Sequence, residues 1–240
     1  MTPCWSPCNC INPIAGHIID QEGAELSQFN DLVEFFDLQE RTTWQTELAA
    51  ELFAHADLEP GMRVLDAGCG AGWLLLRWAR QAKIEVVGID NAPQMIARAR
   101  QNAIQEKQPA TFQVADIRRL DWAAPIFDRV VSTFVFFLFD NPGPTLQEVW
   151  RVVTPGGRLL LFNPGLSCTA PEMEHYATSR GWTGFDHDSF LQWGDVVSRR
   201  RRLTPADVES WWGDQIASFS HASLWNDIGL VTVAVKPSNE

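Results

Sequence analysis

The feature that most constrains this chain is a glycine-rich segment that directly follows a short apolar run. Residues 63–67 read RVLDA, and glycines then occupy positions 68, 70 and 72. Glycine adopts backbone conformations with positive φ and lets another group approach where a Cβ would collide. The pattern therefore predicts a buried strand, a tight turn and a helix, and a nucleotide-type ligand belongs at such a turn.

Strand and helix signals alternate along the rest of the chain. Apolar runs predict further strands at 85–89, 111–115, 128–133 and 158–162. Helical spacing predicts helices at 74–81, 93–105 and 145–153. Two last runs, 216–224 and 230–235, are joined by a tight turn and must pair antiparallel. We expect an α/β fold with a doubly wound sheet of seven strands, mostly parallel with one antiparallel strand.

Charge divides the chain at about residue 60. Residues 1–60 hold 11 acidic residues and one base, Arg41, whereas the remainder holds 19 acids and 18 bases. Apolar residues recur at helical spacing from 27 to 58, which predicts helices with an acidic outer face. We therefore expect an N-terminal tail and helical cap over 1–58 and the main domain over 59–240.

A second segment, at about 164–203, has no clear period. It carries the aromatic residues Trp182, Phe185, Phe190 and Trp193. Long connections inside a compact domain are usually functional lids or disordered, and the aromatic content favours an ordered lid.

Composition excludes several classes of function. The net charge of −11 argues against a nucleic-acid partner, which would require basic patches. The sequence has no run of about 20 apolar residues and no signal-peptide pattern, so we expect a soluble, cytoplasmic protein with no membrane span. Cys4, Cys8 and Cys10 do not have the spacing of a zinc site, so we expect no metal.

The spacing of the glycines distinguishes between nucleotide-type ligands. The dinucleotide-binding pattern needs a glycine at position 73, which is Trp73, and Asp66 places a carboxylate beside the turn. Over residues 60–163 and the terminal strand pair, the sequence resembles the class I methyltransferases, which use S-adenosylmethionine and have a Rossmann-like fold. In that family the turn formed here by Asp66, Gly68, Gly70 and Gly72 holds the methionine end of the cofactor.

The resemblance also implies roles for residues at the ends of other strands. Asp90 would bind the ribose hydroxyls, since a carboxylate accepts from both hydroxyls of a cis-diol. Asp116 and the N–H of Ile117 would bind the adenine, Met95 would pack on its face, and Thr133 would lie under the methionine moiety. The expected cofactor-binding residues are Asp66, Ala67, Gly68, Cys69, Gly70, Gly72, Asp90, Asn91, Met95, Asp116, Ile117 and Thr133. We expect Cys69 to fill space rather than to act as a nucleophile.

The expected reaction is an in-line methyl transfer to a small molecule, in which the protein supplies alignment and desolvation. No catalytic base is assigned; the candidates are an acid of the N-terminal helices or one of four histidines, His17, His175, His187 and His221.

Three readings of the activity remain. An acidic cap and a Trp-rich lid favour an amine acceptor, through charge attraction and cation–π contact. The run from Phe134 to Phe139 favours O- or C-methylation of an apolar aromatic such as a quinone or a polyketide. A domain that binds the cofactor without turnover is the third reading.

Overall fold

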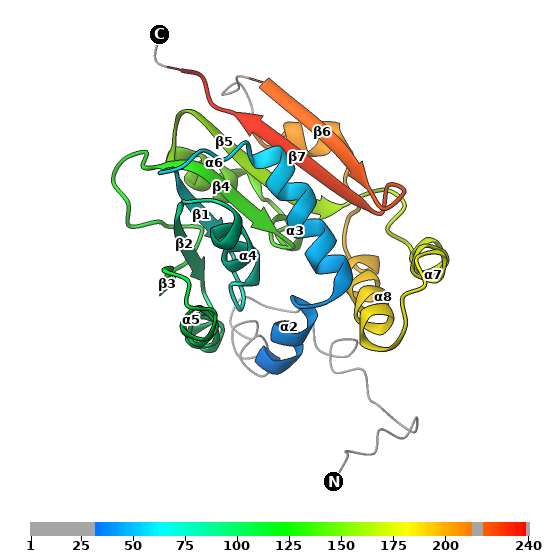
Figure 1. Ribbon diagram of the computed structural model, residues 1–240. Coiled ribbons are helices and arrows are strands. Elements are labelled where there is room, and N and C mark those ends of the chain that lie inside the picture. The colour runs from blue at the N-terminus through cyan, green and yellow to red at the C-terminus, as the bar shows by residue number, and fades with distance from the viewer. Residues whose placement is uncertain (1–31, 213–217, 239–240) are drawn as a thin grey trace.

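A seven-stranded sheet organises the molecule (Figure 1). The computed structural model describes residues 32–212 and 218–238. The strands are β1 (Arg63–Ala67), β2 (Glu85–Asp90), β3 (Thr111–Val114), β4 (Phe127–Thr133), β5 (Val153–Pro164), β6 (Ser218–Leu224) and β7 (Gly229–Val235). Their order is β3-β2-β1-β4-β5-β7-β6, and β7 is the strand of this sheet that runs opposite to the other six. The predicted fold class is confirmed.

The chain reverses its direction of winding at β1. This strand pairs with β2 on one side and with β4 on the other, both in parallel. In doubly wound sheets, ligands bind outside the carboxyl ends of the strands at such a reversal. The register places the carboxyl ends of β1, β2 and β3 next to one another, with Asp90 opposite Val114. The predicted glycine turn therefore follows the strand at which the winding reverses.

Helices cover both faces of the sheet. On one face lie α3 (Thr43–Ala56), α4 (Trp73–Gln81) and α5 (Pro93–Glu106), and on the other lie α6 (Gly143–Arg151) and α9 (Pro205–Glu209) (Figure 1). A short 3₁₀ helix, η1 (Phe136–Leu138), follows β4. Among the helices that the structure describes, we find none with the length and apolar character needed to cross a membrane.

The part of the N-terminal cap that the structure describes, residues 32–58, forms two helices. They are α2 (Val33–Gln39) and α3, and the chain turns between them at Glu40–Thr42 because Thr42 is extended, with φ −66° and ψ 164°. Cys4, Cys8, Cys10 and His17 lie outside the described residues, as does the start of the predicted helical region at 27–31.

Four acids of the described part of the cap, residues 32–58, form ion pairs with arginines of the main domain. The pairs are Glu34 and Asp37 with Arg98, Glu47 with Arg180, and Asp57 with Arg158. Asp37 is buried, whereas the other pairs lie at the surface, where each pair alone contributes little to stability. The acidity of the cap therefore attaches it to the main domain at several places.

The segment at about 164–203, whose apolar residues show no clear period in the sequence, contains two helices. It forms α7 (Ala170–Ser179) and α8 (Gly184–Ser198). The buried stripe of α8 includes Ser189 and Gly194 beside Phe190, Trp193 and Val197, so hydrophobicity alone does not reveal its spacing. Gly194 leaves room for the sulfur of Met173 on α7, which a Cβ at this position would displace.

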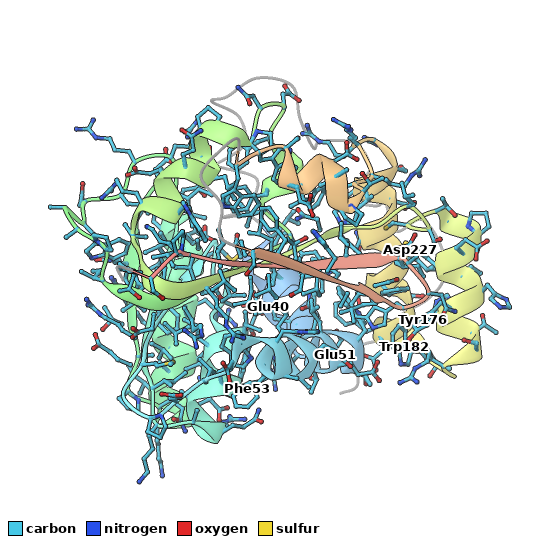
Figure 2. All side chains as sticks on the ribbon, turned by 90° about the horizontal axis from the view of Figure 1, so that it is seen from above. Glu40, Glu51, Phe53, Tyr176, Trp182 and Asp227 are labelled. Atoms are coloured by element: carbon cyan, nitrogen blue, oxygen red, sulfur yellow. The ribbon has the colours of Figure 1, made fainter. Side chains whose placement is uncertain are left out.

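Helix α8 completes an aromatic cluster with α3 and the sheet. We define this cluster as Trp44, Phe134, Phe162, Phe190, Trp193 and Trp225, whose neighbouring ring centroids lie 4.9–6.2 Å apart. In the view from above, Tyr176 and Trp182 lie near Asp227 toward one end of the molecule, whereas Glu40 lies near its middle (Figure 2). Helix α8 thus belongs to the core rather than lying loosely over it.

Replacing Trp193 by Ala tests this packing. Trp193 is 6% exposed and contacts the other five rings of the aromatic cluster, so we expect its loss to destabilise the fold by about 3–5 kcal/mol. Phe185 on the same helix is 41% exposed, and Phe185→Ala should cost about 1 kcal/mol or less. Urea unfolding measures both changes, and equal values for the two variants would contradict the placement of α8.

Candidate active site at the glycine turn

The turn after β1 adopts a backbone that only glycine accommodates without strain. Gly68, Gly70 and Gly72 have φ values of +90°, +52° and +84°. A Cβ at these positions would collide with Val135 of the β4 loop, with the carboxylate of Glu40 and with the ring of Phe112 on β3, respectively. The glycines therefore serve both turn geometry and close approach.

Two of the predicted acids lie against this turn. Asp66 is 1% exposed and its Oδ1 has no hydrogen-bond partner. Asp90, at the end of β2, accepts hydrogen bonds from the backbone N–H of Gly70 at 3.1 Å and of Ala92 at 2.9 Å. The structure thus brings these two carboxylates together on the glycine turn, while Ala67 and Cys69 are buried between them.

The remaining predicted residues lie farther along the same edge. Asp116 follows β3, whose end is tied to β2 by a bond from the N–H of Ala115 to the carbonyl of Asp90, at 3.0 Å. Ile117 and Met95 are buried and Asn91 is exposed.

The carboxylate of Asp116 is bound by its neighbour Arg118. Desolvation alone would raise the pKa of Asp116, but the hydrogen bonds and charge of Arg118 outweigh it and lower that pKa. Asp116 is therefore ionised at neutral pH and able to accept a hydrogen bond.

A small cavity of about 40 Å³ opens beside the turn. Four predicted or singled-out residues line it: Asp66, Cys69, Thr133 and Phe134. The other lining residues come from the cap and α4, and they are Glu40, Gln45, Leu48, Ala49, Leu74 and Arg77. Phe134 itself has φ +61°, a strained conformation for an aromatic residue, which directs its ring into the aromatic cluster next to the cavity.

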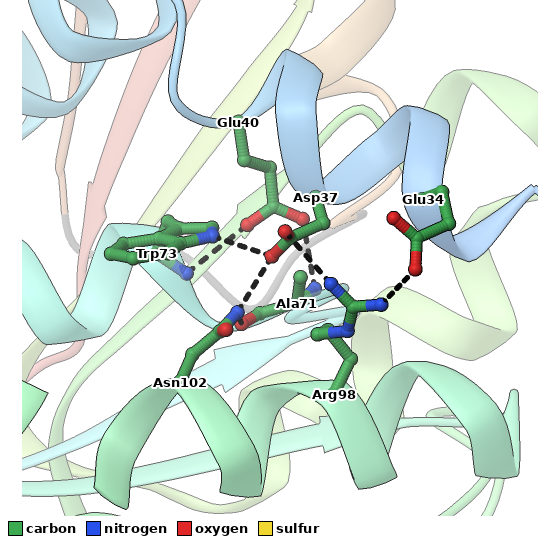
Figure 3. Close-up of polar contacts among 7 residues, drawn as sticks. All are labelled: Glu34, Asp37, Glu40, Ala71, Trp73, Arg98 and Asn102. Atoms are coloured by element: carbon green, nitrogen blue, oxygen red, sulfur yellow. Dashed lines mark hydrogen bonds and ion pairs between the residues drawn. The ribbon is translucent and has the colours of Figure 1, made fainter. Parts of the chain in front are cut away.

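Sequence reasoning did not single out Glu40. Its carboxylate reaches from the cap to the start of α4, where it accepts from the backbone N–H of Ala71 at 2.8 Å and of Trp73 at 3.1 Å (Figure 3). Trp73 is the first residue of α4 and Ala71 directly precedes its N-cap, Gly72, so neither N–H has an acceptor within the helix. The sequence signals only an acidic cap; which acid faces the turn depends on the break between α2 and α3.

A second cap acid anchors α2 beside Glu40. Asp37 is buried and accepts hydrogen bonds from the indole N–H of Trp73, the side-chain amide of Asn102 and the guanidinium of Arg98 (Figure 3). Because α2 is held to both α4 and α5 in this way, the position of Glu40 is fixed.

Burial makes the carboxyl groups at the turn weaker acids than usual. Desolvation raises the pKa of Glu40 to about 7, against the lowering effect of its bonds to Ala71 and Trp73. Desolvation, followed by repulsion from Glu40 and Asp90, raises the pKa of Asp66 well above its usual value. Desolvation also raises the pKa of Asp90, and backbone N–H donors partly offset the effect.

The thiol of Cys69 is a filler in this environment. Burial, together with the charge of Asp66, raises its pKa well above the usual value. A thiol that does not ionise is a poor nucleophile.

The residues present fit S-adenosylmethionine. Its methionine end carries an ammonium and a sulfonium, and the turn offers buried carboxylates, one of them with an oxygen that has no partner. The positive-φ glycines leave the backbone open to close approach. Asp90 and Asp116, at the ends of β2 and β3, would meet the ribose and the adenine.

Comparison with known proteins shows which domains this chain is similar to. Residues 65–161 match a protein-family profile described as a methyltransferase domain. A demethylmenaquinone methyltransferase of Deinococcus radiodurans is 34% identical over 158 residues, which are 62% of this chain and 64% of the relative. A phosphoethanolamine N-methyltransferase of Arabidopsis thaliana is 29% identical over 153 residues, which are 63% of this chain and 31% of the relative. The chain thus spans less than two thirds of the length of either relative.

A solved structure shares the fold. The magnesium protoporphyrin IX methyltransferase of Synechocystis PCC 6803, with bound S-adenosylhomocysteine, superposes with a TM-score of 0.56 at 21% identity and covers 93% of this chain and 91% of its own. The sheet and its flanking helices are therefore those of the methyltransferase fold.

The raised acid pKa values predict that stability falls as pH rises. Between pH 4.5 and about 7, the folded state holds a proton on Glu40 that the unfolded state has released. Ionising Glu40 in the folded protein therefore costs stability, on the order of 2 kcal/mol, across this range. We expect the thermal midpoint of the cofactor-free protein to be lower at pH 8 than at pH 5.5.

Two variants separate the contribution of Glu40 from the rest. Glu40→Gln should reduce the difference between the two pH values, whereas Glu34→Gln, on the same cap and largely exposed, should retain it. An identical pH dependence in Glu40→Gln and the wild type would contradict the assignment.

Proposed function

We propose that this chain, which carries a class I S-adenosylmethionine-dependent methyltransferase domain, transfers a methyl group from that cofactor to a small molecule. One observation carries the proposal. Asp66, Asp90 and Asp116 lie at or just beyond the carboxyl ends of three adjacent strands, next to a turn with three positive-φ glycines. A doubly wound domain without such a ligand would have no need to bury two carboxylates at this edge.

Different residues of the chain would bind different parts of the cofactor. Bound there, S-adenosylmethionine supplies a methyl group already activated on a sulfonium. The glycine turn and Asp66 bind the methionine end, and Asp90 accepts from the ribose hydroxyls. Asp116 and the N–H of Ile117 bind the adenine, on which Met95 packs. The protein's task is then alignment and exclusion of water.

The acceptor is proposed to be an amine. Phe134 lines the cavity and belongs to the aromatic cluster, and the face of an aromatic ring attracts cations. The similarity to a phosphoethanolamine N-methyltransferase supports the same class of acceptor.

A neutral aromatic acceptor is the second candidate. Phe134 presents an apolar ring to the cavity, with the rest of the aromatic cluster packed behind it, and the 34% identical relative is a demethylmenaquinone methyltransferase. Offset stacking and apolar burial would bind a flat ring there without a charge.

Substitution of Asp90 tests the cofactor site. In Asp90→Ala the ribose hydroxyls would lose their acceptor, and we expect the dissociation constant for S-adenosylhomocysteine to rise about 5- to 150-fold, equivalent to about 1–3 kcal/mol. Asp121→Ala removes an exposed acid of the loop before β4 and should leave binding unchanged. Isothermal titration calorimetry measures both, and an unchanged constant in Asp90→Ala would contradict the assignment.

A panel of acceptors tests the acceptor class. We expect tritium from labelled S-adenosylmethionine to enter small primary and secondary amines in preference to hydroxyaromatics and quinols. A preference for the neutral aromatics would favour the second candidate. Cofactor binding with no labelled product, from the panel or from cell extracts, would favour a binding module without turnover.

A further inference from the structure

The cap places one buried carboxylate in the cavity, and this carboxylate has no assigned role in the proposed reaction. Glu40 lines the cavity together with Asp66, and its Oε1 lies so close to Gly70 that a Cβ there would collide with it. Each carboxylate oxygen of Glu40 accepts one backbone N–H, from Ala71 or Trp73, which leaves further lone pairs available.

The groups that face Glu40 leave an excess of negative charge. Asp66 lies on β1, Asp90 at the end of β2 and Asp37 on α2, and each is an acid. The cation lining the cavity is Arg77 of α4, whose guanidinium donates to the carbonyl of Glu40 at 2.6 Å and to Thr46 at 3.2 Å. Of the polar atoms here, Oδ1 of Asp66 is buried with no partner. Buried carboxylates in such an arrangement require a cation or a proton.

We propose that Glu40 is a cofactor ligand supplied by the cap, and that its carboxylate binds the α-ammonium group of the cofactor's methionine end. This inference rests on the proposed function. An ammonium group is small enough for the cavity. It supplies the positive charge that balances Glu40 and Asp66, and it can donate hydrogen bonds to both. Arg77 lines the same cavity and supplies a cation for the carboxylate of that methionine end.

A different reading of the same contact makes the opposite prediction. If Glu40 merely covered the start of α4 and had to leave before the cofactor entered, removing its charge would tighten binding. If Glu40 is a ligand, removing its charge weakens binding. The effect of one substitution on affinity therefore separates the two.

The test compares two ligands that differ only at the methionine end. S-adenosylhomocysteine carries the ammonium, whereas 5′-methylthioadenosine lacks the amino-acid part and keeps the thioether, ribose and adenine. In Glu40→Gln we expect affinity for S-adenosylhomocysteine to fall about tenfold or more, with affinity for 5′-methylthioadenosine unchanged. Glu34→Gln, from the exposed end of the same cap, should alter neither.

A second measurement uses the wild type alone. Because the pKa of Glu40 is about 7, it is mostly protonated at pH 6 and ionised at pH 8. We expect S-adenosylhomocysteine to bind about tenfold more weakly at pH 6 than at pH 8, while 5′-methylthioadenosine binds alike at both. This comparison holds even if Glu40→Gln fails to fold.

Three results would overturn the proposal for Glu40: unchanged or tighter binding of S-adenosylhomocysteine in Glu40→Gln, equal weakening of both ligands, or equal pH dependence of both. In each of these, binding by the wild type leaves the proposed function standing. Failure of the wild type to bind either ligand would instead overturn the proposed function, and the inference with it.

Discussion

Close approach to the glycine turn is the constraint on which the site depends. Three parts of the chain meet the turn where a Cβ would stand: the β4 loop through Val135, the cap through Glu40, and β3 through Phe112. Any side chain at these glycines would have to displace one of the three. The turn is therefore the point at which the cap, the central strands and the loop leading to the aromatic cluster are fixed relative to one another.

The charges around this turn connect stability with function. Four acids within residues 32–58 of the cap are matched by arginines of the main domain, so they attach α2 and α3 without facing the cavity. Glu40 of the cap and Asp66 of β1 line the cavity instead, and desolvation raises the pKa of both. Burying such groups costs folding free energy, and a cationic ligand would recover it on binding. The site is thus less stable alone than with the kind of ligand proposed.

The sequence predicted the sheet, the glycine turn and the acids at the strand ends because each depends on residues close together in the chain. It did not predict the contact of Glu40 with the turn, since an acidic helix face does not reveal which acid reaches a turn 31 residues away. It also gave no helix at 184–198, where Ser189 and Gly194 interrupt the apolar stripe and contacts with α3 and α7 stabilise the helix instead. Long-range packing explains both omissions.

The central claim is that S-adenosylmethionine lies across the carboxyl ends of β1, β2 and β3. A crystal structure of the protein with S-adenosylhomocysteine tests this claim most directly. We expect electron density with the ribose hydroxyls at Asp90, the adenine next to Asp116 and Met95, and the methionine end on the glycine turn. Density for the ligand at any other part of the molecule, with the turn unchanged, would contradict the claim.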